Sequence, residues 1–132
     1  MNLLDENIRH DQEDRLRQWR VKFRRISESI ARPGIQDPDI IPLLHRLKNP
    51  TLFTHDQDFF KPALAHRAYC LAWLDLYDGD GAVFIRRFLR HPEFRTQAQR
   101  MGKVVRVHPD GLHYWQAGKP RRVSVKWREN ET

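Results

Sequence analysis

The stretch Thr51-Leu-Phe-Thr-His-Asp-Gln-Asp-Phe-Phe60 contains an apolar run that ends in alternating Thr and Asp residues. The run predicts a buried strand over residues 51–54. The last residues of this strand are expected to carry carboxylates at every second position, and in a strand residues i and i+2 point to one side, with Cα atoms about 6.5–7 Å apart. Thr54, Asp56 and Asp58 would then converge, and their oxygen atoms suit a hard divalent cation. The alternative is that the aspartates only cap a turn or the next helix.

The segments before this stretch predict alternating strands and helices. The expected elements are a strand at residues 1–4, a helix within 9–19 with Asp11 as its N-cap, a strand within 20–27, and a helix from Asp37 to Asn49-Pro50. The order strand–helix–strand–helix–strand is typical of a parallel sheet with right-handed crossovers.

Acidic residues follow the strands of this predicted sheet, where ligands of open parallel sheets bind. Asp5 follows the first strand and Asp56 the third, while Asp37 begins a helix that should start near the same edge because it runs antiparallel to the strands. Carboxylates gathered there would repel one another unless a cation neutralised them. The pattern predicts a metal site made of Asp5, Asp37, Asp56 and Asp58, supported by Thr54 and Glu6. The structural alternative is that Asp5 only ends a strand and Asp37 only caps a helix.

The second half of the chain predicts more strands and helices. The expected elements are a strand at 69–76, a helix at 81–90, a short helix within 93–101, and strands at 103–108, 112–116 and 121–127. The last three strands should form a small antiparallel meander. At 132 residues, the chain is expected to be one domain, with an α/β core at 1–102 and a meander at 103–132.

The net charge of +7 is unevenly distributed along the chain. Residues 1–80 hold 12 Lys/Arg and 13 Asp/Glu, whereas residues 81–132 hold 12 Lys/Arg and only 4 Asp/Glu. An acidic site joined to a basic half suits a polyanionic substrate that is processed at a metal. A basic surface without a partner is the alternative.

The remaining composition favours a cytoplasmic protein that does not cross a membrane. No stretch approaches the roughly 20 apolar residues needed to span a bilayer. The opening residues lack the basic and apolar regions of a signal peptide. The single cysteine, Cys70, lies in an apolar run and is expected in the core.

Three short motifs resemble those of a known family. Leu3-Leu-Asp5-Glu-Asn7, Gln36-Asp-Pro-Asp-Ile40 and Thr54-His-Asp-Gln-Asp-Phe59 resemble the acidic motifs of the PIN-like nucleases, especially the short bacterial kind that opens with LLDEN. The resemblance covers residues 1–60. It implies a three-layer fold, with a mainly parallel sheet between helices, and hydrolysis of RNA with Mg²⁺ or Mn²⁺, often as the toxin of a toxin–antitoxin pair.

The same resemblance assigns roles to particular residues. It implies that Asp5, Asp37, Asp56 and Asp58 are catalytic metal ligands and that Thr54 orients the last carboxylates. Many PIN domains carry an additional acid, often Glu, on a helix between the first and last motifs. Here Asp37, at the start of a helix, has to take that place.

The first functional hypothesis is therefore a metal-dependent ribonuclease. Arg86, Arg87 and Arg90 would bind the RNA backbone together with the basic meander, and Trp115 or Tyr114 would either stack on bases or belong to the meander core. His55 should face away from Asp56, which argues against a zinc site. The rival hypotheses are an inactive PIN-like module that binds nucleic acid or protein, and a structural domain that is basic without a partner. An antitoxin partner and a homodimer stay open.

Overall fold

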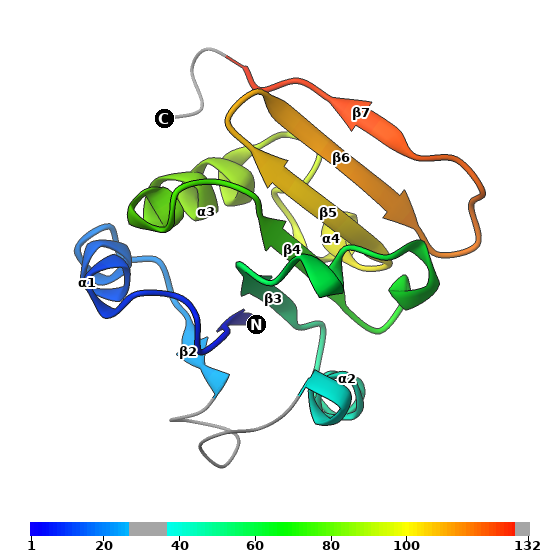
Figure 1. The fold of residues 1–132 in the computed structure, drawn as a ribbon, viewed down its shortest axis with the longest axis horizontal. Coiled ribbons are helices and arrows are strands. Elements are labelled where there is room, and N and C mark those ends of the chain that lie inside the picture. Colours follow the sequence, from blue (N-terminus) through cyan, green and yellow to red (C-terminus); the bar gives the residue numbers. More distant parts are fainter. Residues whose placement is uncertain (27–36, 129–132) are drawn as a thin grey trace.

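The computed structural model describes residues 1–26 and 37–128, with the backbone alone at residues 37 and 38, and these residues form one seven-stranded sheet (Figure 1). The strands are β1 (Asn2–Leu4), β2 (Arg24–Arg25), β3 (Thr51–Thr54), β4 (Cys70–Leu74), β5 (Lys103–His108), β6 (Gly111–Gln116) and β7 (Val123–Val125). They lie in the order β2-β1-β3-β4-β5-β6-β7. The first five are parallel, and β6 and β7 are antiparallel additions. The predicted α/β class with a mainly parallel sheet is confirmed.

Helices lie on both faces of this sheet, which gives three layers. The α-helices are α1 (His10–Gln18), α2 (Asp37–Arg46), α3 (Gly81–Arg90) and α4 (Gln97–Arg100), and the 3₁₀ turns are η2 (Gln57–Phe59), η3 (Pro62–Leu64) and η4 (Asp78–Asp80). One hydrophobic core joins α1 and α3 to the sheet, and a second core joins α2 and η2 to the opposite face.

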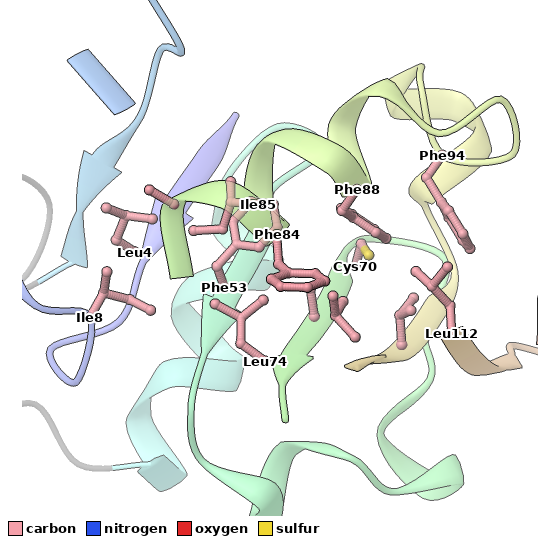
Figure 2. Close-up of a cluster of buried hydrophobic side chains, with 14 of the residues drawn as sticks. Leu4, Ile8, Phe53, Cys70, Leu74, Phe84, Ile85, Phe88, Phe94 and Leu112 are labelled. Atoms are coloured by element: carbon pink, nitrogen blue, oxygen red, sulfur yellow. The ribbon is translucent and has the colours of Figure 1, made fainter. Parts of the chain in front are cut away.

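The larger core lies between α3 and the central strands (Figure 2). Phe53 on β3 meets Phe88 on α3 edge to face, with ring centroids 5.7 Å apart. All four residues of β3 are buried, because a central parallel strand is covered on both faces. Cys70 is buried in this core, as predicted.

Several element boundaries differ from the sequence predictions. The second strand is only Arg24–Arg25, and the short helix is only Gln97–Arg100. Arg9, not Asp11, occupies the N-cap of α1, while Asp11 lies in the first turn and pairs with Arg9 at 2.8 Å. The predicted meander also belongs to the main sheet, because its first strand, β5, pairs parallel with β4.

The strand order places a topological switch between β1 and β3. After β1 the chain passes to the face covered by α1, where Leu16 is buried, and after β3 it passes to the other face, where Phe59 is buried. Ligands of open α/β sheets bind at the carboxyl ends of two such strands. Asp5 and residues 55–58 follow the two strands at this position.

Candidate functional site

Asp5 and Thr54 form a buried hydrogen-bonded pair at the carboxyl ends of β1 and β3. The Thr54 hydroxyl donates to Asp5 Oδ2 at 2.7 Å, and the backbone N–H of Glu6 donates to Asp5 Oδ1 at 2.8 Å. Asp5 is 7% exposed and Thr54 is fully buried. The parallel pairing of β1 with β3 brings these residues together, although 49 positions separate them.

Thr54 also positions Asp56. Its hydroxyl oxygen accepts the backbone N–H of Asp56 at 3.0 Å while donating its proton to Asp5. The negative charge of Asp56 is close enough to raise the pKa of Asp5. The structure therefore brings two of the predicted acids, Asp5 and Asp56, to the same edge around one threonine.

Burial controls the electrostatics of Asp5. Desolvation raises the pKa of its carboxyl, and the nearby charges of Glu6 and Asp56 add to this rise. The hydrogen bonds from Thr54 and from the Glu6 backbone act in the opposite direction without cancelling it. A carboxylate held in this way would be stabilised by a cation.

Asn7 completes the connection between the two loops. Its amide nitrogen lies 3.2 Å from Thr54 Oγ1 and 3.5 Å from Asp5 Oδ2, and its carbonyl accepts the backbone N–H of His55 at 3.0 Å. Asn7 ends the motif Leu3-Leu-Asp5-Glu-Asn7, but the sequence analysis assigned it no function. Its position two residues after Asp5 could have indicated a role in the site, because it repeats the i, i+2 spacing of Asp56 and Asp58.

Asp58 does not continue the strand pattern that the sequence suggested. The strand ends at Thr54, and Gln57–Phe59 forms the 3₁₀ turn η2. Asp56 caps this turn, because its Oδ1 accepts the backbone N–H of Asp58 at 2.9 Å. The predicted strand-like convergence of Asp56 and Asp58 is wrong, and Asp58 is exposed.

The other predicted acids contribute less to the described geometry. Glu6 is exposed, and its charge acts on Asp5. Asp37 is the first residue of α2, and its side chain lies outside the described part of the chain. Among the described residues, no group of three or more His, Cys, Asp or Glu side chains could hold a metal ion. The carboxylates of Asp5 and Asp56, which lie at the same edge and interact through their charges, are oxygen ligands of the kind that Mg²⁺ or Mn²⁺ prefers.

A buried ion pair holds the loop that carries Asp5. The Arg25 guanidinium lies 2.6 Å from the Glu13 carboxylate and donates to the backbone carbonyls of Asp5 at 3.2 Å and Ile8 at 2.6 Å. Both charged side chains are almost fully buried. The pair therefore ties α1 and β2 to the β1–α1 connection.

His55 points away from this site, as its neighbouring position predicted. Its Nδ1 lies 3.0 Å from the carbonyl of Leu74, and its ring approaches Gly81 at the start of α3. Its Nε2 is buried without a hydrogen-bond partner among the described residues.

The three arginines proposed for RNA binding lie on the second half of α3. Two of them make cation–π contacts. The Arg86 guanidinium is 4.7 Å from the Trp19 ring centroid, and the Arg87 guanidinium is 4.4 Å from the Trp127 ring centroid. Arg90 is exposed at the helix end. Because α3 runs back from the carboxyl edge, Arg90 lies toward the edge opposite Asp5.

Comparison of the chain with family models, with curated proteins and with solved structures gives no match. Within the described residues, no helix is long and apolar enough to cross a membrane.

Proposed function

We propose that this chain is a metal-dependent ribonuclease that hydrolyses RNA phosphodiesters beside Asp5 and Asp56. One observation carries the proposal: buried Asp5 shares Thr54 with Asp56 at the switch point between β1 and β3. The resemblance of the surrounding motifs to PIN-like nucleases points to the same residues.

Each residue of the site has a separate task in this proposal. Asp5 and Asp56 hold the cation, with Asp37 and Asp58 as further candidate ligands. Thr54 and Asn7 are positioning residues, since their hydrogen bonds fix the two carboxylate-bearing loops relative to each other. A bound Mg²⁺ or Mn²⁺ would supply Lewis acidity toward the phosphate and an activated water.

Calorimetric titration with Mn²⁺ tests the metal site, comparing wild type with the Asp56→Asn/Asp58→Asn variant. We expect binding in the wild type and its loss in the variant, because two ligand charges are removed. The Asp14→Asn/Asp110→Asn variant is the matched control, since it removes two exposed carboxylates elsewhere and should bind like wild type. Absence of Mn²⁺ binding in the wild type would contradict a preformed site.

Cleavage of a labelled single-stranded RNA separates the nuclease from the inactive binding module. Under the proposal, wild type cleaves with Mn²⁺, a chelator stops cleavage, and the Asp56→Asn/Asp58→Asn variant loses at least about 100-fold in rate. The inactive module predicts RNA binding without cleavage in both proteins.

A further inference from the structure

One face of the sheet carries a row of polar and aromatic side chains that begins at the candidate site. Thr54 pairs with Trp73, Trp73 with Arg106, Arg106 with His113, and His113 with Ser124. Directly paired residues point to the same face of a sheet. The row therefore runs across β3, β4, β5, β6 and β7, starting from the threonine that binds Asp5.

The outer part of this face is not covered by a helix in the described part of the chain. The core residues of α1 and α3, together with Phe94, pack on the other face. On this face α2 packs near β1 and β3, and the segment of η2 and η3 packs over β4 and the neighbouring part of β5. Figure 1 shows α4 behind β5 and β6. A hollow of about 410 Å³ lies here, and its charged and polar lining residues are Arg106, His108, Asp110, His113, Ser124 and Lys126.

Trp115 presents an indole ring on this same face, in the row next to His113. It is half-buried, and no ring contact or hydrogen bond involves its side chain among the described residues. Trp73 differs, because its ring lies 5.5 Å from that of Phe60 and 5.6 Å from the Arg106 guanidinium. Tyr114 is 8% exposed and belongs to the core of the opposite face. Trp115 is therefore the ring positioned to accept a stacked base.

The charge around these rings is positive. Burial and the nearby side chains of Arg122, Arg106 and His108 lower the pKa of His113, so two arginines lie close to this imidazole. Lys126 and Arg122 are exposed. Asp75 pairs with Arg106 at 2.5 Å, so this arginine is fixed in place beside Trp73. A mainly cationic face with a partly exposed indole complements a phosphate chain whose bases are unpaired.

We propose that the face of β5–β7 that no helix covers in the described part of the chain, with Trp115, His113 and Lys126 as its contacts, binds single-stranded RNA and directs it toward Asp5. About 19 Å separate β1, which leads into Asp5, from β6, which carries Trp115, given roughly 4.8 Å between neighbouring strands. A duplex would not fit the same role, because its bases are stacked within the helix and cannot reach Trp115. The cleavage of the bound RNA at Asp5 rests on the proposed nuclease function, whereas the binding of RNA to this face does not.

Fluorescence anisotropy with a labelled oligouridine of about 12 nucleotides tests the face in the presence of a chelator, so that no cleavage occurs. Trp115→Ala should weaken binding about 5- to 100-fold, the range of one lost base stack. Trp115→Phe should recover most of the affinity, because phenylalanine keeps an aromatic face.

A charge reversal provides the second measurement. Lys126→Glu should weaken binding and reduce its dependence on salt concentration. Lys48→Glu makes the same charge change at an exposed position after α2 and should match wild type. Equal weakening by both variants would show a nonspecific charge effect and overturn the assignment of this face.

The outcomes separate this inference from the nuclease proposal. Binding that Trp115→Ala weakens supports the face even if wild type never cleaves RNA, a result that would contradict the nuclease alone. If the Trp115→Ala and Lys126→Glu variants both bind RNA like wild type, the assignment of this face as the RNA-binding surface is wrong, even if the protein cleaves RNA. Duplex RNA bound as tightly as oligouridine would also overturn it.

Discussion

Asp5 is a buried carboxyl whose surroundings only partly stabilise its charge. Thr54 and the Glu6 backbone donate to its two oxygens, yet burial still raises the pKa of the carboxyl. A group in this state is suited to bind a cation, because the cation supplies the charge compensation that two neutral donors do not.

The raised pKa of Asp5 gives metal binding a pH dependence. A cation binds the ionised carboxylate, so Mn²⁺ affinity should fall as the pH drops through the raised pKa, above the ordinary aspartate value of about 3.9. Calorimetric titrations at decreasing pH measure this. Affinity that stays constant down to the ordinary aspartate range would contradict the role of Asp5.

Thr54 is the residue on which both acidic loops depend. Thr54→Val keeps the shape but removes the hydroxyl that donates to Asp5 and accepts from Asp56, so the protein should lose about 1–3 kcal/mol of unfolding free energy. Urea denaturation measures this loss. Thr54→Ser keeps the hydroxyl and should retain most of the stability and Mn²⁺ binding. Equal stability of Thr54→Val and wild type would show that the hydrogen bonds contribute nothing.

At the scale of elements, a buried ion pair between Glu13 of α1 and Arg25 of β2 connects these two elements to the loop that carries Asp5. Burial acts to raise the pKa of Glu13, but the hydrogen bond and charge of Arg25, with help from Arg17 and His10, hold it below its usual value. The same arginine donates to the carbonyls of the β1–α1 connection. Two residues of strand are enough here because Arg25 supplies side-chain bonds that a longer ladder would otherwise provide.

Arg25→Met should therefore destabilise the fold strongly. Removing Arg25 leaves the buried Glu13 charge with only the exposed side chains of Arg17 and His10 as partners, so the loss should approach about 3–5 kcal/mol. Arg24→Met, at the exposed neighbouring position on β2, should change the unfolding free energy by less than about 0.5 kcal/mol. Urea denaturation compares the two, and Arg25→Met/Glu13→Met should recover part of the loss. Similar effects of Arg24→Met and Arg25→Met would contradict the role of the ion pair.

At the scale of the whole molecule, the sheet separates a closed face from a partly open one. Two cores fill the space under the helices, while the outer strands leave aromatic and cationic side chains accessible on one side. The basic half of the chain thus extends the same sheet that presents the acids at its edge.

Cys70 lies on the central strand β4, so the reactivity of its thiol measures whether the sheet is folded. Burial raises the pKa of its thiol to about 12, and the side chain is fully buried on a central strand. A thiol reagent should therefore react only when the whole sheet unfolds, so labelling in urea should follow the unfolding transition. Mass spectrometry of the labelled protein measures this. Rapid labelling under native conditions would contradict a rigid central sheet.

The sequence by itself determined the local elements whose apolar pattern agrees with their burial. The strand 51–54 and the helix 81–90 have the predicted bounds, because one is buried on both faces and the other has a continuous apolar side. The bounds of β2 and α4 were predicted less well. These short elements are held by side-chain hydrogen bonds of Arg25 and by the Thr96 cap, and such contacts leave no apolar periodicity in the sequence. Asp5 and Asp56 were both candidates from the sequence before the structure showed their shared hydrogen bonds to Thr54.

Only the tertiary structure decided how distant residues combine. It showed that Asp56 caps a turn rather than extending a strand, that Asn7 bonds to Thr54, and that residues 103–108 join the parallel sheet. It also decided which aromatic side chain of β6 is partly exposed: Tyr114 is buried, whereas Trp115 is half-buried. The physical reason is that strand register and loop contacts arise between segments far apart in the chain, whereas periodicity records only which side of its own element a residue occupies.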